Sequence, residues 1–247
     1  MFVELLKFQR KKHLQKGNRE RTMRILPSIL SDQSEVVAHQ LELLHSLSSE
    51  YEVDAVQMDI LDGEYADNVT ISPLDLYGFN FKDLKVDLHL MTIEPLDYVY
   101  EAKELADEVA FNMIIGQVER MSSQEDFVQE VKKQHWLPGL SLDAYTPVEE
   151  LSRRALEDVR VVQIMGIQAG FQGQKFIEHT YKTIADARAL LDQVNPDIEL
   201  IVDGGVKPVH LSKLEELGVD TVVVGSVLWN TKDIEAAFDS LYDGMMK

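Results

Sequence analysis

Cysteine is absent from the 247-residue sequence, so neither a disulfide bond nor thiolate chemistry is available to the protein. This composition suits the reducing cytoplasm, where we expect the protein to be located. Long apolar segments are also missing: no run of about 18 uncharged apolar residues occurs, and the sequence therefore predicts no membrane-spanning helix. Low-complexity linkers and obvious internal repeats are lacking as well, which favours a single domain.

Positive charge is scarce and unevenly placed. The whole chain has 24 Lys and Arg against 43 Asp and Glu, a formal net charge of −19. Residues 1–24 hold eight of the basic residues and only two Glu, a net charge of +6, which leaves −25 for the rest of the chain. So acidic a body repels nucleic acid and anionic membranes, and we expect neither as a partner. An anionic substrate must therefore be bound through local dipoles, a cation or a bound metal.

The first 22 residues do not share the pattern of the rest. Residues 1–8 are apolar with helical spacing, and residues 9–22 are basic and polar. We interpret residues 1–22 as a loosely ordered basic arm and residues 23–247 as one folded domain. Two alternatives stay open: a targeting peptide, against which Glu4 and Glu20 argue, and a biological start at Met23, directly before the first expected strand.

Short apolar runs rich in β-formers recur along the rest of the chain, each followed by a polar stretch compatible with a helix. The eight runs are Arg24–Leu30, Val53–Asp59, Leu84–Leu90, Glu108–Met113, Leu137–Leu142, Val159–Met165, Ile198–Asp203 and Asp220–Gly225. Strands that alternate with amphipathic helices pair in parallel through right-handed crossovers. Eight such units predict a closed (β/α)8 TIM barrel, because an open doubly wound sheet, which the pattern alone also allows, usually has fewer strands.

In such a barrel the reactive side chains lie at the carboxyl ends of the strands. Asp59 ends the second run, His89 the third and Asp203 the seventh, and the two-residue period of a strand places Gln57 on the same face as Asp59. Two carboxylates that face each other across a carbon atom suit a proton transfer with two bases. A histidine beside carboxylates suits a divalent cation. The alternative is that each is a buried polar residue satisfied by its neighbours.

Glycine-rich segments follow the last three runs, at residues 166–174, Gly204–Gly205 and Gly225–Ser226. Loops after the seventh and eighth strands of such barrels often bind phosphate through backbone N–H groups, because glycine allows close approach. Glycine also simply makes turns, but two pairs at consecutive strand ends favour a phosphate site. Binding by neutral amides would also explain how so acidic a protein holds an anion.

Six short motifs occur in order between Arg24 and Phe238. They are Ile25–Ser31, Met58–Gly63, Asn68–Thr70, Asp87–Met91, Gly170–Phe176 and Val202–Val206. Together they resemble the ribulose-phosphate 3-epimerase family. The resemblance implies a ribulose-phosphate-binding barrel and an isomerase of the pentose phosphate pathway, a part of carbohydrate metabolism. Its reaction would be the metal-assisted epimerisation at C3 that converts ribulose 5-phosphate to xylulose 5-phosphate.

The resemblance also implies roles for individual residues. Asp59 and Asp203 would exchange roles as acid and base. A divalent metal (Zn, Mn, Fe or Co) would be bound by Asp59, His89, Asp203 and, less firmly, Gln57. The substrate and its phosphate would be contacted by Ser28, Gly170, Gly173, Gly204, Gly205, Gly225 and Ser226.

Several positions depart from the family's pattern. Gln57 and Asn112 stand where the family has histidine, Leu61 where it has methionine, and Gln168–Ala169 where it has Asn-Pro. An amide oxygen is a weaker ligand than imidazole, so we expect the metal affinity to be lower by on the order of 10–100-fold. These changes keep alternatives open: a phosphosugar-binding barrel without turnover that acts as a sensor or partner protein, or an epimerase or lyase for a related ketohexose phosphate. The sequence leaves the oligomeric state open, including a homo-oligomer.

Overall fold

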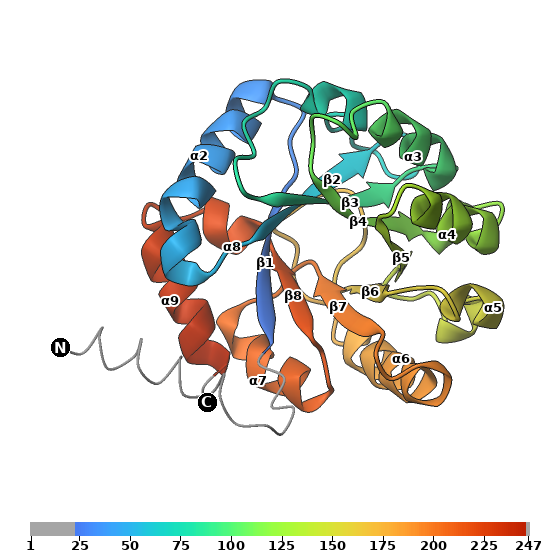
Figure 1. Ribbon diagram of the computed structural model, residues 1–247. Coiled ribbons are helices and arrows are strands. Elements are labelled where there is room, and N and C mark those ends of the chain that lie inside the picture. Colours follow the sequence, from blue (N-terminus) through green and yellow to red (C-terminus); the bar gives the residue numbers. More distant parts are fainter. Residues whose placement is uncertain (1–22, 246–247) are drawn as a thin grey trace.

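The computed structural model describes residues 23–245, so the basic arm expected over residues 1–22 lies outside the described residues. Eight strands form the centre of the molecule and helices surround them (Figure 1). The strands are β1 (Arg24–Ile29), β2 (Ala55–Leu61), β3 (Lys85–Met91), β4 (Phe111–Gln117), β5 (Leu137–Leu142), β6 (Val161–Met165), β7 (Glu199–Asp203) and β8 (Thr221–Val224).

Every strand pairs in parallel with the next, and β8 pairs in parallel with β1, so the sheet is closed in the order β1 to β8. This last pairing, which sets Leu26 opposite Val223, excludes the open doubly wound sheet. The predicted (β/α)8 barrel is therefore confirmed. Seven of the predicted runs match their strands to within two residues at each end.

The fourth predicted strand was wrong in its bounds. The sequence suggested Glu108–Met113 with Asn112 at the carboxyl end, whereas β4 runs from Phe111 to Gln117. Asn112 lies near the amino-terminal end of β4, where its side-chain nitrogen donates to Asp87 Oδ1 at 2.7 Å. The polar residue at the carboxyl end of β4 is Gln117, so the position equivalent to a strand-end ligand was assigned to the wrong residue.

The helices that follow the strands cover the outside of the barrel (Figure 1). They are α2 (Ser34–Tyr51), α3 (Pro95–Lys103), α4 (Gln124–Lys133), α5 (Arg153–Leu156), α6 (Thr180–Val194), α7 (Pro208–Glu216), α8 (Ser226–Trp229) and α9 (Ile234–Met245), with 3-10 turns at η1 (Pro73–Leu76), η2 (Val118–Arg120) and η3 (Val148–Glu150). Each longer helix turns one apolar face inward; in α2 this face is formed by Val37, Leu41, Leu44 and Leu47.

Two apolar layers hold the barrel together. The larger core lies between the strands and the helices, where outward-facing residues such as Leu88 and Val202 meet helix residues such as Phe127 and Phe238. A smaller cluster fills the barrel interior with Leu26, Ala55, Met113, Ile115, Val161, Ile201 and Val223. Because side chains alternate along a strand, the next inward positions toward the carboxyl ends are Ser28, Gln57, Gln117, Gln163 and Asp203. The interior thus changes from apolar to polar toward the rim of the barrel.

A hydrogen bond at this rim joins the first strand of the barrel to the segment that follows the last strand. Trp229 at the end of α8 donates its indole N–H to the backbone oxygen of Ser28 in β1, with a separation of 2.6 Å. The bond connects residues that are 201 positions apart in the sequence. It holds the end of β1 against the short helix that follows β8, and both flank the polar interior.

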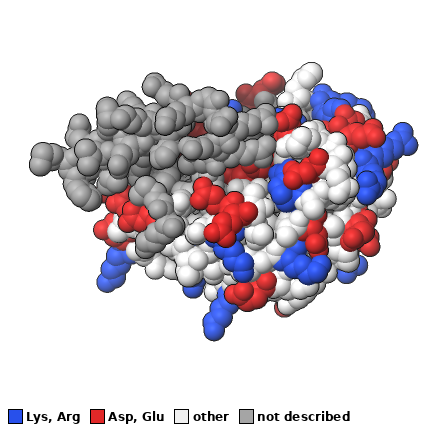
Figure 2. All heavy atoms as spheres, turned by 90° about the horizontal axis from the view of Figure 1, so that it is seen from below, with Lys and Arg blue, Asp and Glu red and all other residues white. Residues whose placement is uncertain are grey.

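No helix within residues 23–245 is long and apolar enough to cross a membrane. On the described part of the face shown in Figure 2, Lys and Arg side chains are interspersed with Asp and Glu. The acidic excess of the sequence therefore does not separate into regions of one sign on that part of the surface.

Candidate active site

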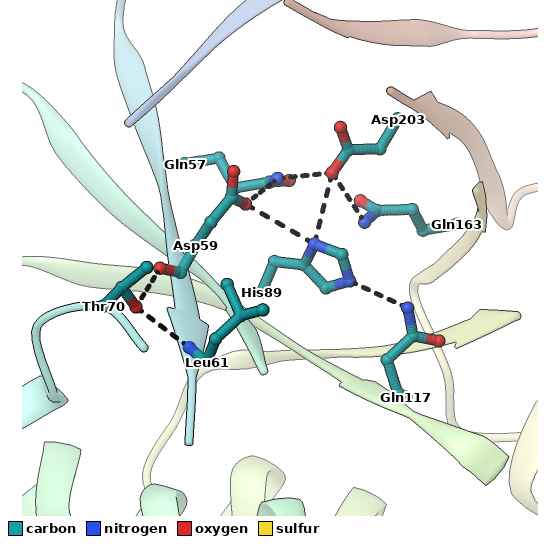
Figure 3. A network of polar contacts seen from close by, with 8 residues as sticks. All are labelled: Gln57, Asp59, Leu61, Thr70, His89, Gln117, Gln163 and Asp203. Carbon is teal, nitrogen blue, oxygen red and sulfur yellow. Dashed lines mark hydrogen bonds and ion pairs between the residues drawn. The ribbon is translucent and has the colours of Figure 1, made fainter. Parts of the chain in front are cut away.

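Asp59, His89 and Asp203 converge at the carboxyl ends of β2, β3 and β7 (Figure 3). One ligand atom from each of the three lies within 4.8 Å of the other two. His89 Nδ1 is 3.2 Å from Asp203 Oδ2 and 3.5 Å from Asp59 Oδ1. The three side chains are buried, with His89 fully inaccessible to solvent. The sequence-based prediction that these residues meet is therefore matched by their positions.

The two carboxylates make this a site for a cation. Burial and the nearby charge of Asp203 raise the pKa of Asp59 to about 6. Burial lowers the pKa of His89, but its contacts with Asp203 and Asp59 outweigh burial and raise that pKa to about 9. In the absence of any other cation, a proton on His89 balances part of the negative charge.

Gln117 determines which nitrogen of the neutral His89 ring carries the proton. The amide of Gln117 lies 3.3 Å from His89 Nε2. When the amide is turned by 180° from its orientation in Figure 3, its oxygen accepts from Nε2, and its nitrogen donates to Ser141 O at 3.0 Å and to Glu119 Oε2 at 3.1 Å. This orientation satisfies both ends of the amide. With the proton of neutral His89 held on Nε2, the lone pair of Nδ1 points between Asp59 and Asp203, as metal ligation requires.

Gln57 lies between the two carboxylates. Its Nε2 donates to Asp59 Oδ1 and to Asp203 Oδ2, both at 2.7 Å, while its buried Oε1 has no hydrogen-bond partner among residues 23–245. Gln163 makes a similar contact from β6: its Nε2 is 3.2 Å from Asp203 Oδ2, and its Oε1 is likewise without a partner. Rotation of the Gln57 amide would turn its oxygen toward the carboxylates, which is favourable only with a cation between them.

The donor set fits a divalent cation. Asp59, His89 and Asp203 supply two carboxylates and one imidazole at converging positions, and rotation of the Gln57 amide would add its oxygen as a fourth ligand. Three oxygens and one nitrogen form a harder donor set than two or three imidazoles do. The weakened site expected from Gln57 is thus consistent with its contacts, since the amide nitrogen rather than the oxygen faces the carboxylates.

Backbone and side-chain hydrogen bonds fix the end of β2. The hydroxyl of Thr70 donates to Asp59 O at 2.7 Å and accepts from Leu61 N–H at 2.9 Å (Figure 3). Beyond the strand, the Asp62 carboxylate accepts from Tyr65 N–H at 2.8 Å and from Ile93 N–H at 2.6 Å. The bonds of Asp62 join the loops after β2 and β3, and together with those of Thr70 they fix the position of the strand end that carries Asp59.

A cavity opens above the carboxylates. It is lined by the two aspartates and by all the residues expected to contact substrate, namely Ser28, Gly170, Gly173, Gly204, Gly205, Gly225 and Ser226. Its apolar wall includes Leu30, Met91, Met165 and Ile167. Gly205 has a φ of +70°, and a Cβ at this residue would lie 2.9 Å from Phe176 N, so only glycine fits there. The cavity therefore borders both carboxylates and the glycine-rich backbone.

Sequence reasoning missed three glutamines of the site. Gln163 lies inside β6 between apolar residues and gives no sequence signal except the strand period that points it inward. Gln117 lies four residues beyond Met113, where the predicted strand ended, so it was not recognised as the residue at the strand end. Gln172 lines the cavity from the loop after β6. Asn112, by contrast, belongs to the other end of the barrel.

Metal binding is expected to release protons and to strengthen as the pH rises. Below about pH 9 His89 carries a proton that a metal must displace, and below about pH 6 the same holds for Asp59. The affinity for Mn²⁺ should therefore increase by roughly tenfold per pH unit from about pH 6 to about pH 8. Calorimetric titration in buffers of different protonation enthalpy measures both the affinity and the released proton. An affinity that is independent of pH would contradict this expectation.

Comparisons with known proteins show the family of the chain. Residues 24–229 match the model of the "Ribulose-phosphate 3 epimerase family". The chain is 30% identical over 220 residues to the ribulose-phosphate 3-epimerase of Helicobacter pylori, covering 89% of this chain and 96% of that protein. It is 32% identical over 223 residues to the chloroplastic ribulose-5-phosphate-3-epimerase of Arabidopsis thaliana, covering 88% and 75%.

More distant solved structures share the fold. A 3-hexulose-6-phosphate synthase matches with a TM-score of 0.57 and 14% identity, covering 91% of this chain and 99% of that one. A tryptophan synthase structure from Mycobacterium tuberculosis matches with a TM-score of 0.62 and 13% identity, covering 91% and 93%. At these identities the likeness extends to the barrel alone.

Proposed function

Because the chain belongs to the ribulose-phosphate 3-epimerase family, we propose that it is an isomerase that inverts C3 of a phosphorylated ketose, converting ribulose 5-phosphate to xylulose 5-phosphate. The observation that carries the proposal is the position of Asp59 and Asp203 on two strands that are not neighbours in the barrel, β2 and β7, both lining the cavity that the glycine-rich loops enclose. A sugar carbon between them has one carboxylate on each face.

Inversion at a carbon next to a carbonyl requires that a proton leaves one face and another proton arrives at the opposite face. Asp59 and Asp203 approach the cavity from β2 and β7 and are suited to these two tasks. In one direction Asp59 acts as base and Asp203 as acid, and in the other direction the roles are exchanged. Both residues have buried surroundings, which keeps bulk water away from the reacting carbon.

Asp59, His89, Asp203 and the rotated amide of Gln57 would hold a divalent cation, for which Zn, Mn, Fe and Co are the candidates. Such a cation supplies positive charge where negative charge develops on the sugar oxygens as the C3 proton leaves. Gln117 keeps Nδ1 of His89 free for ligation by accepting the proton of Nε2. The backbone of Gly173, Gly204, Gly205, Gly225 and Ser226 would hold the phosphate, with Ser28 and Gly170 beside the substrate.

The experiment is a coupled assay of ribulose 5-phosphate and xylulose 5-phosphate interconversion, with the protein supplemented in turn by each of the four metals. Turnover in at least one metal is expected. A ketohexose 6-phosphate assayed in parallel distinguishes an epimerase for a related sugar. The proposal fails if no metal yields turnover while a family member of known activity is active under the same conditions.

One observation favours a second candidate, a phosphosugar-binding barrel without turnover that serves as a sensor or partner protein. The amides of Gln57 and Gln163 already donate to the carboxylates, so the site has internal partners without a metal. This candidate predicts that the protein binds sugar phosphate with the same affinity in the presence and absence of a chelator. The epimerase predicts that a chelator abolishes turnover.

A further inference from the structure

No positively charged side chain of residues 23–245 lines the cavity above the carboxylates. Among the described residues that line it, the only charged ones are Asp59 and Asp203. The only side chains there with hydrogen-bond donors are those of Ser28, Gln172 and Ser226. An anionic ligand in this cavity would therefore be bound by neutral donors. Each donor would contribute a larger share of the binding free energy than it would beside a lysine or an arginine.

The side chain of Gln172 reaches the centre of the glycine-rich end of this cavity. A Cβ at Gly225 would lie 2.4 Å from Gln172 Nε2, 2.8 Å from Gln172 Cδ and 3.0 Å from Ser28 Oγ. The amide thus packs directly on the backbone of Gly225, beside the hydroxyl of Ser28. Gly225 precedes the first residue of α8, where the expected phosphate donors lie. Only glycine at this position leaves room for the amide.

The amide nitrogen of Gln172 has no acceptor among the residues that the structure describes. Nε2 is buried and makes no hydrogen bond within the described structure. A buried donor without a partner is unfavourable, and an oxygen-bearing ligand that enters the cavity would remove this cost. Of the three side-chain donors, Gln172 is the one that combines burial with an unused N–H.

The loop that carries Gln172 is tied down on both sides. Asn68 Nδ2 donates to Gly170 O at 2.6 Å, which anchors the start of the loop to the segment after β2. Gln174 Nε2 donates to Gln168 O at 2.7 Å and to Phe171 O at 2.8 Å, which closes the loop on itself. The amide is therefore presented to the cavity by a braced loop.

We propose that Gln172 is a phosphate-recognition residue whose amide donates to a phosphate oxygen of the sugar phosphate. This inference rests on the proposed function, since the phosphate belongs to the substrate assigned there. The Gln172 amide acts together with the backbone N–H groups of Gly205, Gly225 and Ser226 and replaces the cationic side chain that this acidic protein lacks at the site. It thereby adds to the preference for phosphorylated over unphosphorylated ketoses.

The full chain is titrated calorimetrically with inorganic phosphate and with ribulose 5-phosphate. Gln172→Ala should weaken the binding of both by about tenfold, the effect of one hydrogen bond to a charged group. Gln172→Glu has the same shape but brings a carboxylate to the phosphate, so its loss should exceed that of Gln172→Ala. The φ of Gln172 is not positive, so neither substitution strains the backbone. In turnover, Gln172→Ala should raise KM with little change in kcat.

Gln174→Ala is the matched control, because it removes the bonds that close the same loop without reaching Gly225. It should weaken phosphate binding by less than about threefold, well below the effect of a hydrogen bond to a charged group. Equal losses in Gln172→Ala and Gln174→Ala would mean that only the order of the loop matters, and would overturn the inference. Unchanged or tighter binding by Gln172→Ala would overturn it as well. If the wild type binds neither inorganic phosphate nor ribulose 5-phosphate, the proposed function fails together with this inference.

Discussion

Asp203→Asn is expected to lower kcat for ribulose 5-phosphate epimerisation by at least about 10³-fold, because it removes one of the two acid-base groups and a cation ligand at once. The asparagine keeps the shape of the side chain, so the barrel should remain folded. Binding of ribulose 5-phosphate should change by less than about threefold, since the phosphate is held at the glycine-rich end of the cavity. Steady-state kinetics and calorimetry together separate these two effects.

The matched control is Asp87→Asn, which changes another buried aspartate; Asp87 lies in β3. Burial raises the pKa of Asp87 to about 6, and its Oδ1 accepts from Asn112 and from Met113 N–H, away from the cavity. An asparagine keeps one acceptor oxygen there, so activity should stay within about threefold, as for a polar change away from the reacting groups. If Asp203→Asn retained turnover comparable to that of Asp87→Asn, the assignment of two aspartates as acid and base would be wrong.

Isotope exchange adds a qualitative test of the two-base proposal. In D2O the wild type should incorporate deuterium at C3 of both epimers. A variant with one carboxylate, either Asp59→Asn or Asp203→Asn, should exchange the C3 proton of only one epimer, because a base remains on only one face. The two variants should act on opposite epimers. Proton NMR of the substrate follows this directly.

Gln57→His is expected to tighten Zn²⁺ binding by on the order of 10–100-fold. The Gln57 side chain already lies 2.7 Å from both carboxylates, so an imidazole there adds a nitrogen ligand in place of an amide that donates to them. The affinity for Mn²⁺ should rise much less, because Mn²⁺ prefers oxygen ligands. Competition with a chromophoric chelator measures both affinities without recourse to turnover.

Gln163→His provides the control for this change. Gln163 is also a buried glutamine that donates to Asp203 Oδ2, but from the side of β6 and without a contact to Asp59. The Gln163→His substitution should leave the preference between Zn²⁺ and Mn²⁺ unchanged. Equal gains in zinc affinity from both variants would show that any added imidazole strengthens the site, and that position 57 has no special place in it.

The sequence predicted the barrel well because the strand pattern is strong wherever a strand is buried on both sides. Asp59, His89 and Asp203 could be found because each follows an apolar run, and the fold rule places such positions at one rim. The prediction failed at β4, where Asn112 interrupts the apolar run and was taken for the polar residue at the end of the strand. Local composition cannot distinguish an interrupted strand from a finished one.

The glutamines of the site could not be predicted for a different reason. Their roles depend on contacts between strands that are distant in sequence, such as Gln117 with His89 and Gln163 with Asp203. A neutral amide also gives no signal of charge or of titration. Gln172 was harder still to predict. Its contact with Gly225 depends on the path of a loop, and a loop has no strand or helix periodicity from which the direction of a side chain can be predicted.

The bond between Trp229 and Ser28 has a consequence for how the protein folds. It joins the first strand to the helix after the last one, so the contact cannot form until nearly the whole chain has been synthesised. Contacts between residues so far apart in sequence form slowly. The pairing of β1 with β8, the seam that closes the barrel, should therefore be among the last strand pairs to form. Ser28 and Gly225 line the cavity on either side of that seam. A bound sugar phosphate would thus contact both sides of the β1–β8 pair. Its binding should stabilise this pair and slow the separation of the two strands.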